Sequence, residues 1–382
     1  MPKRSENWRI ALQQRWAEAQ LQTILQHSAD DVRPRTSAAA IVASMMALII
    51  LLTPFAVAGL SALLIWWSGA TIVGVIFGAL ILLIAYFLLP NVGRTDGGTY
   101  TREELPALFE LVDKIADRMT APRIDFINID ANYNAYVARL GHRRRRLMGI
   151  GLALWQVLEN DERVALIGHE LAHEVNGDPA RSLLIGAAEE TLARWHDILM
   201  PDEYEAHRYP DDSFGASLAL ILMRIAAFVV RQIQYSLFLL HMRDSQRAEY
   251  YADLLAARTA GSSAMSGLLR HLVCAPEVQR AIGFAAALRK LTGSELMHSL
   301  KPQLENLPSE RLDKLLADME AERSTIDASH PPTAFRLRFI AAHEQLAPEF
   351  DAATADWQAI NAELEGFLEP AGRVLMDEAS EY

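Results

Sequence analysis

Cysteine is nearly absent from this chain of 382 residues, which contains only Cys274. A disulfide scaffold is therefore excluded. Basic residues are also in the minority, because 36 Lys and Arg stand against 48 Asp and Glu, and the formal net charge is −12. Since nucleic-acid binding needs a basic face, this balance argues against nucleic acid as a partner. Disorder and a collagen-like fold are excluded because 51% of the residues are hydrophobic.

Charged residues are missing altogether from residues 37–93. Within this block, residues 38–67 and 70–89 are each long enough to cross a bilayer, which takes about 20 apolar residues in a helix. Trp66 and Trp67 end the first run beside the turn, where aromatic side chains anchor a helix at the membrane interface. A signal peptide fits poorly, because the block starts far from the N-terminus and contains two runs. We therefore predict a transmembrane helical hairpin, with a hairpin buried in a soluble protein as the alternative.

Basic residues flank both ends of the predicted hairpin, whereas its turn carries no charge. The positive-inside rule then predicts that the N-terminal segment and the large C-terminal part both lie in the cytoplasm. We therefore predict a multi-pass protein of the inner (plasma) membrane. Trp8, Leu12 and Trp16 recur every four residues, which predicts an amphipathic helix within residues 1–36. Its apolar face would lie on the membrane or pack on the protein.

From residue 94 onward the pattern is that of a globular α+β domain that is mostly helical. Thr101 and Glu104 form a capping-box pattern, which predicts the start of a helix. Alternating apolar residues predict a strand over residues 123–129. Two further strands, over residues 136–140 and 147–152, are expected to flank a basic tip.

The residues that carry chemistry begin with the motif His-Glu-Leu-Ala-His at 169–173. Histidines four residues apart project from one face of a helix, so His169 and His173 can bind a single zinc ion. Glu170 lies beside the first ligand and can take a proton from a water that the metal activates. A surface helix that happens to carry these residues is the alternative. The apolar residues at 164–167 argue instead for a core helix.

A catalytic zinc ion usually has three protein ligands and one open position. The segment Arg-Ala-Glu-Tyr-Tyr-Ala-Asp at 247–253 places Glu249 and Asp253 on one helical face. We interpret Glu249 as the third ligand and Asp253 as the acceptor for the second ring N–H of a zinc-bound histidine. The other candidates are His241 and Asp244. Two solvated acids on a surface helix are the alternative without a metal.

The zinc motif followed by the segment at 247–253 resembles the gluzincin peptidases of metallopeptidase family 48. Members of this family include the HtpX-type membrane proteases and the CAAX prenyl proteases. The resemblance extends over about residues 94–340. It implies a zinc metallopeptidase domain of the gluzincin type with a small β-sheet, one Zn²⁺ ion per chain, and Glu249 as the third ligand.

Two shorter elements support the resemblance. Asn134, Ala135 and Tyr136 are similar to the family's Asn-Ala-aromatic element, just ahead of the edge strand that binds extended substrate. The resemblance therefore implies that these three residues bind substrate. His330, in a His-Pro-Pro sequence with Arg336 downstream, resembles a late element of the family. The resemblance implies that His330 is a catalytic residue that stabilises the transition state.

One interval departs from the HtpX-type pattern, which places two further membrane spans between the zinc motif and the third ligand. Here the interval is mostly polar, and only residues 216–240 are apolar enough to consider. Arg224 and Arg231 fall within them, and charges inside a span are costly unless they face protein or water. A single span would also separate Glu249 from the zinc motif. We predict that residues 216–240 form a long helix, buried or lying on the membrane, that leads into Glu249.

These patterns predict a membrane-anchored zinc metalloendopeptidase that hydrolyses polypeptides in or near the lipid bilayer, with membrane protein quality control implied by the family. One alternative is a catalytically silent membrane scaffold that retains the fold, and another is a zinc hydrolase with a non-peptide substrate. Residues 200–215 are a candidate lid. The predicted parts are a cytoplasmic helix at 1–36, the hairpin at 37–93, the metallopeptidase domain at 94–345 and a C-terminal helical extension at 346–382.

Overall fold

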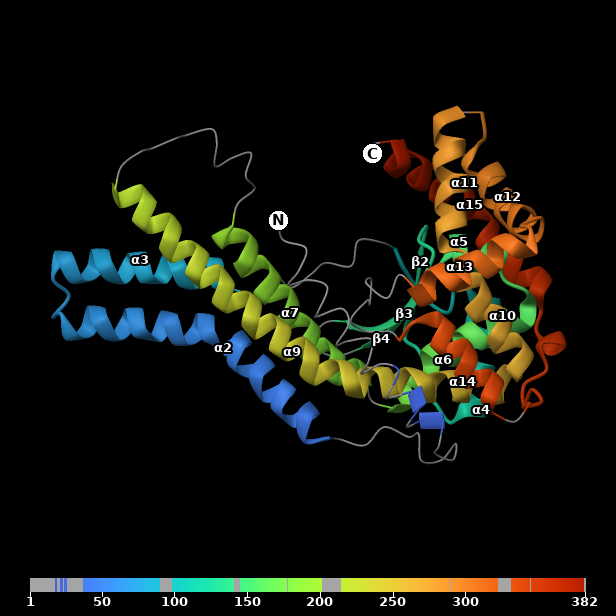
Figure 1. Cartoon of the computed structure of the whole chain (residues 1–382), viewed down its shortest axis with the longest axis horizontal. Coiled ribbons are helices and arrows are strands. Elements are labelled where there is room, and N and C mark those ends of the chain that lie inside the picture. The colour runs from blue at the N-terminus through green and yellow to red at the C-terminus, as the bar shows by residue number, and fades with distance from the viewer. Residues whose placement is uncertain are drawn as a thin grey trace. The chain divides into compact units, whose positions relative to one another are not determined.

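The computed structural model describes residues 18, 21–22, 24–25, 37–89, 98–140, 145–176, 178–200, 214–288, 290–321, 331–343 and 345–380. The described part is mostly helical with one small β-sheet, which confirms the predicted α+β class (Figure 1). The chain divides into two compact units. The sheet unit contains residues 96–179 and 245–382 together with N-terminal residues, and the apolar unit contains residues 35–95 and 180–244.

The sheet has four strands in the order β1-β2-β4-β3. Their bounds are Thr99–Tyr100 for β1, Phe126–Asp130 for β2, Ala135–Leu140 for β3 and Arg145–Gly151 for β4. β2 and β4 are parallel, whereas β1 pairs with β2 and β3 pairs with β4 in antiparallel fashion. The three predicted strands are therefore confirmed, with ends shifted by a few residues. β3 lies at an edge, with β4 as its one neighbour among the described strands.

The first long helix of the sheet unit, α4, covers Pro106–Met119 and begins later than the capping-box pattern predicts. The two capping residues do interact, since the backbone N–H of Thr101 donates to Glu104 Oε2 over 2.8 Å, but they close a turn ahead of the helix. Leu105 precedes a proline, and a residue in that position is driven out of the α region by steric clash. The helix therefore starts at Pro106, where a proline fits without loss of a hydrogen bond.

Helices of 6 to 24 residues and one 3₁₀ turn form most of the rest of the described sheet unit and share one core with it. They are α5 (Leu152–Val157), α6 (Asn160–Asn176), α10 (Ser262–Val273), α11 (Ala275–Leu288), α12 (Gly293–Glu305), α13 (Ser309–Ala321), α14 (Thr333–Ala342), the 3₁₀ turn η2 (Ala352–Thr354) and α15 (Trp357–Ser380). Leu21 and Ile24 are buried in this core, so this part of the N-terminal segment packs on the protein. Trp8, Leu12 and Trp16 lie outside the described residues.

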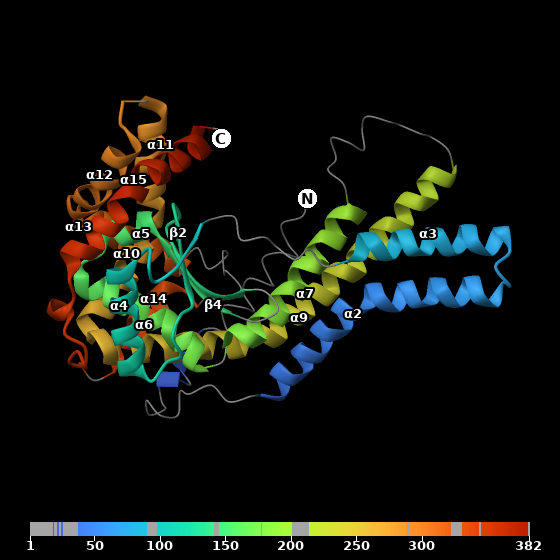
Figure 2. The same ribbon diagram turned by 180° about the vertical axis from the view of Figure 1, so that it is seen from behind.

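The apolar unit begins with α2 (Ala38–Trp67) and α3 (Ile72–Leu88), which pair as a helical hairpin (Figure 2). Small residues allow the close approach, because a Cβ at Gly78 would lie only 2.4 Å from Ile65 Cγ1. The hydroxyl of Ser61 also donates to the carbonyl oxygen of Gly78 over 2.6 Å. The predicted pair of apolar helices is thus present, joined by a short turn.

Two further helices belong to the described part of the apolar unit. They are α7 (Asp178–Leu199) and the first part of α9 (Phe214–Ala260), which continues without a break into the sheet unit. α7 buries Ile185, Ala188 and Leu192 in a cluster that includes residues of α2 and α9. The polar composition of this interval did not indicate such a packing face.

The helix predicted for residues 216–240 is present as part of α9, and part of its apolar surface is exposed. Leu220, Ile221 and Leu222 are 52%, 53% and 58% exposed. Ala227 and Leu237 of the same helix are 3% and 0% exposed, so one side of it is buried, and its contact with a membrane remains a prediction. By length and composition, α2 and residues Leu220–Ala260 of α9 could each cross a membrane, and α3 is a shorter apolar helix.

Candidate metal centre

Helix α6 carries the two histidines of the zinc motif into the core of the sheet unit. Its first turn contains acidic residues, which suit the positive end of the helix dipole. Val164 and Leu171 are fully buried, and His169 and Glu170 are 5% and 8% exposed. The helix is therefore a core helix, as the apolar flanks of the motif predict. The same helix contacts the edge strand β3.

The last part of α9 packs closely against α6. A Cβ at Gly168 would lie 3.5 Å from Ala256 Cα, and Ala252 and Ala256 are fully buried. These small residues leave room for the helices to approach each other. As a result, Glu249 and Asp253, one turn apart on α9, both reach the histidines of α6.

Three side chains converge on one point. The Nε2 atoms of His169 and His173 are 3.3 Å apart. The carboxylate of Glu249 places Oε2 3.5 Å from His169 Nε2 and Oε1 3.3 Å from His173 Nε2. A tetrahedral zinc ion with bonds of about 2.0–2.2 Å would hold its ligand atoms roughly 3.3–3.6 Å apart. The donor set therefore fits zinc with one position left for water or substrate, and no other such group occurs among the described residues.

His169 has carboxylates near both of its ring nitrogens. Its Nδ1 atom lies 3.1 Å from Asp253 Oδ1, on the side away from the point of convergence. Burial alone would lower the pKa of His169, but the interactions with Asp253 and Glu249 outweigh it and raise the pKa to about 9. The surroundings thus favour a positive charge at this point, and a divalent metal ion would supply one.

Arg336 of α14 holds Asp253 in place. Its guanidinium donates from Nε to Asp253 Oδ2 over 2.9 Å and from Nη2 to Oδ1 over 2.6 Å. Burial would raise the pKa of Asp253, but the charge and hydrogen bonds of Arg336, together with His169, hold it below its ordinary value. Arg336 is 4% exposed. In the sequence, Arg336 is marked only by its place after the His-Pro-Pro element, and that place does not predict its contact with Asp253.

The three residues predicted to bind substrate lie at the start of edge strand β3. The carbonyl oxygen of Asn134 accepts a hydrogen bond from the N–H of Gly151 over 2.9 Å. Tyr136 pairs with Gly149, where a Cβ would lie 2.2 Å from the tyrosine ring, and Ala135 packs against the core. The structure therefore brings these residues onto a strand edge in the same unit as the metal centre.

The other candidates from the sequence are His330, the lid segment, His241 and Asp244. His330 and residues 201–213, which include most of the candidate lid, lie outside the described residues, so both remain predictions. His241 does not belong to the convergent group found among the described residues, and the side chain of Asp244 lies outside the described part.

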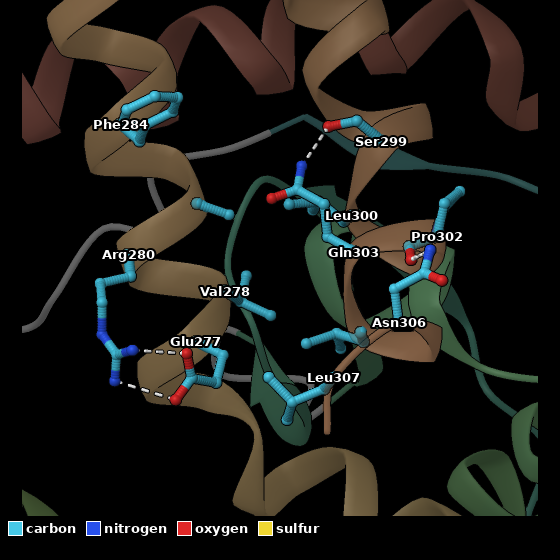
Figure 3. A pocket seen from close by; sticks show the side chains of 12 residues that line it. Glu277, Val278, Arg280, Phe284, Ser299, Leu300, Pro302, Gln303, Asn306 and Leu307 are labelled. Atoms are coloured by element: carbon cyan, nitrogen blue, oxygen red, sulfur yellow. Dashed lines mark hydrogen bonds and ion pairs between the residues drawn. The ribbon is translucent and has the colours of Figure 1, made fainter. Parts of the chain in front are cut away.

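A separate groove of about 780 Å³ lies between α11 and α12 and is lined mainly by apolar side chains such as Val278 and Leu300 (Figure 3). None of the residues at the metal centre lines it.

The chain is similar to known proteases over most of its length. The model of the family described as Peptidase family M48 matches residues 103–344. A "Protease HtpX homolog" of Pyrobaculum calidifontis is 25% identical over 275 residues, which are 70% of this chain and 76% of that protein. "Protease HtpX" of Pseudomonas putida is 25% identical over 246 residues, which are 60% of this chain and 81% of that protein. The matched region includes every residue of the convergent group.

Proposed function

Because the chain belongs to peptidase family M48, a family of proteases, we propose that it is a membrane-anchored zinc endopeptidase. The observation that carries this proposal is the convergence of His169, His173 and Glu249 at the spacing of zinc ligands. All three side chains are buried or half-buried. The two histidines each offer a ring nitrogen when deprotonated, and such nitrogens are common zinc ligands.

We propose that His169, His173 and Glu249 together bind one zinc ion per chain. When bound, the ion polarises the peptide carbonyl and lowers the pKa of a water toward neutrality. Glu170, next to the first ligand, takes a proton from the attacking water and returns it to the leaving amine. Asp253 accepts the Nδ1 proton of His169, which leaves Nε2 free as the metal ligand. On the family resemblance, we propose that His330 stabilises the transition state.

We propose that substrate binds as an extended peptide along β3. The free backbone edge of a strand can pair with an added strand, and the main-chain hydrogen bonds then give affinity without demanding one side-chain sequence. Asn134, Ala135 and Tyr136 lie at the start of this edge, in the same unit as the metal centre. Their position supports a groove for polypeptides over a closed pocket for a small molecule.

The apolar unit supports an anchor in the lipid bilayer. Exposed apolar side chains cover α2 and α3, and Trp66 and Trp67 at the end of α2 are 77% and 81% exposed. Such a surface is costly in water and stable in hydrocarbon. We propose that the sheet unit lies in the cytoplasm, as the positive-inside rule indicates, and that the substrates are membrane or membrane-near proteins under quality control.

The experiment that tests the proposed function uses the full chain purified in detergent. Its metal content is measured by mass spectrometry, and its cleavage of casein and of an unfolded membrane protein is followed by gel. We expect about one zinc per chain, with cleavage that stops when zinc is chelated and returns when zinc is added. A chain without zinc, or cleavage that survives chelation, would contradict the proposal.

A further inference from the structure

Glu174 directly follows the proposed ligand His173, and its side chain is completely buried. Successive residues of an α-helix point about 100° apart, so Glu174 projects to a different side of α6 from His173. There it meets two arginines of the sheet. Arg139 Nη2 of β3 lies 2.6 Å from Glu174 Oε2, and Arg146 Nε of β4 lies 3.2 Å from the same oxygen.

The two arginines are direct neighbours across the strand pair. Arg139 and Arg146 are opposite each other in the register of β3 and β4. Like charges in directly opposite positions destabilise a pair of strands. Because Glu174 binds both guanidinium groups, it removes this repulsion and also links the sheet to the helix that carries the metal ligands.

The position of β3 depends strongly on its inner face, since β4 is its one neighbour among the described strands. Ala135 and Val137 of this strand pack against the core of the sheet unit. Arg139 follows on the same face, because side chains alternate along a strand. The inward-facing side chains of β3 therefore end at Arg139, which forms an ion pair with Glu174 of α6, the residue after His173.

We propose that Glu174 is a positioning residue that fixes the substrate-binding edge strand against the helix of the metal ligands. A peptide paired along β3 presents its scissile bond to Glu170 only if the strand and the helix keep one spacing. The ion pair from Arg139 to Glu174 sets that spacing at the end of β3 remote from Asn134. This inference rests on the proposed function, because that function makes β3 the binding edge for extended polypeptides.

The strand itself gives the first test, which needs no activity. Amide hydrogen exchange of residues 135–140 is measured by mass spectrometry in wild type, Glu174→Gln and Arg139→Gln, as full chains in detergent. Both substitutions are expected to speed exchange in β3 at least tenfold. Arg139→Gln keeps the pair between Glu174 and Arg146, so it remains informative if Glu174→Gln does not fold. Unchanged protection of β3 in a folded variant would overturn the proposal.

The chain offers a matched control in Glu277, a mostly buried carboxylate that also binds two arginines. Arg280 Nη1 lies 2.6 Å from Glu277 Oε2 (Figure 3), and Arg311 Nε lies 2.8 Å from Oε1. These residues belong to α11 and α13, not to the sheet or to α6. Glu277→Gln is therefore expected to lower overall stability without a selective change in β3. If it speeds exchange in β3 as much as Glu174→Gln does, the effect is general destabilisation and the proposal fails.

Substrate length gives the second test. A peptide long enough to pair along β3 and a short peptide around the same bond are compared in the same variants, with zinc content measured in parallel. We expect Glu174→Gln to lower kcat/KM for the long peptide at least tenfold, mainly through KM, and to change the short peptide and zinc content much less. Equal losses on both peptides would overturn the positioning role. If wild type cleaves neither peptide, the proposed function fails, while hydrogen exchange still decides the role of Glu174.

Discussion

His169 Nδ1 lies 3.1 Å from Asp253 Oδ1, while Nε2 of the same ring faces the carboxylate of Glu249 at 3.5 Å. A proton on Nδ1, facing the Asp253 carboxylate, would leave the lone pair on Nε2, which is the arrangement that a metal ligand requires. Arg336 in turn fixes the orientation of the Asp253 carboxylate. The convergence of the three proposed ligands therefore depends on two residues that do not bind the metal.

Asp253→Asn tests this dependence. We expect the affinity for zinc to fall by about 10–100-fold, because the His169 ring loses its fixed proton and orientation. Since Arg336 would be left buried without its carboxylate, the free energy of unfolding is also expected to fall by about 3–5 kcal/mol. Competition with a chelator and denaturant unfolding measure the two effects. Zinc affinity equal to that of wild type would contradict the assigned role.

The exposed residue Glu349 supplies a control for that substitution. Its carboxylate lies 3.7 Å from Arg118 Nε, and both side chains are more than half exposed. Because surface ion pairs contribute about 0–1 kcal/mol, Glu349→Gln is expected to leave zinc affinity and stability close to wild type.

Gly151→Ala tests the close approach at the start of β3. A Cβ at Gly151 would lie 2.1 Å from the carbonyl oxygen of Asn132 and 2.6 Å from that of Asn134, so the backbone must shift. We expect a loss of about 1–3 kcal/mol in stability and weaker binding of long peptides, measured by denaturant unfolding and by KM. Gly366→Ala on α15 is the matched control, since a Cβ there meets nothing within 4 Å. Equal stability of both variants would contradict the geometry.

The pair of half-buried His271 and buried Glu162 predicts how stability depends on pH. His271 Nδ1 lies 3.2 Å from Glu162 Oε2. Burial would lower the pKa of His271, but Glu162 outweighs it and raises the pKa above 6.5. Burial would raise the pKa of Glu162, but His271 outweighs it and holds the pKa below 4.5. The stability from His271 is therefore complete below pH 6.5 and is lost at higher pH, and that from Glu162 is complete above pH 4.5 and is lost at lower pH.

His271→Gln is expected to remove the alkaline part of this profile. Wild type should lose stability as the pH rises through the raised pKa of His271, whereas the variant should be less stable at pH 6 and flatter above it. Denaturant unfolding from pH 5 to 9 measures both profiles. The same alkaline decline in the variant would show that another group causes it.

Membrane topology can be tested with single cysteines. Cys274 is 6% exposed, and burial raises the pKa of its thiol to about 11, so it is expected to react slowly. We expect an impermeant maleimide to label Ser68→Cys, in the turn between α2 and α3, in intact cells. Ser380→Cys at the end of α15 should be labelled only after lysis. Labelling of Ser380→Cys in intact cells would reverse the proposed orientation.

The candidate residues of the metal centre could be predicted because their local spacing in the sequence puts each pair of them on one helical face. Helical period places His169 and His173 on one face, and the same rule places Glu249 and Asp253 on another helix. Apolar runs without charge likewise predict α2 and α3. These features depend on neighbours within one or two turns, which a sequence shows directly.

Contacts between distant segments could not be predicted in this way. Nothing in the sequence pairs Arg336 with Asp253, or Glu174 with Arg139, because each contact joins residues from different elements of the fold. Burial of α7 was missed because its packing face is a stripe of small and apolar residues within a polar sequence. The late start of α4 follows from Pro106, whose steric effect on Leu105 outweighs the capping pattern.

The most direct test of the central claim is the rate of peptide cleavage by Glu170→Gln, measured beside its zinc content. The account predicts that the variant keeps about one zinc per chain, because Glu170 is not a ligand, and that cleavage falls by about 10²–10⁴-fold with the loss of general base catalysis. A variant that retains zinc and cleaves as fast as wild type would contradict the account.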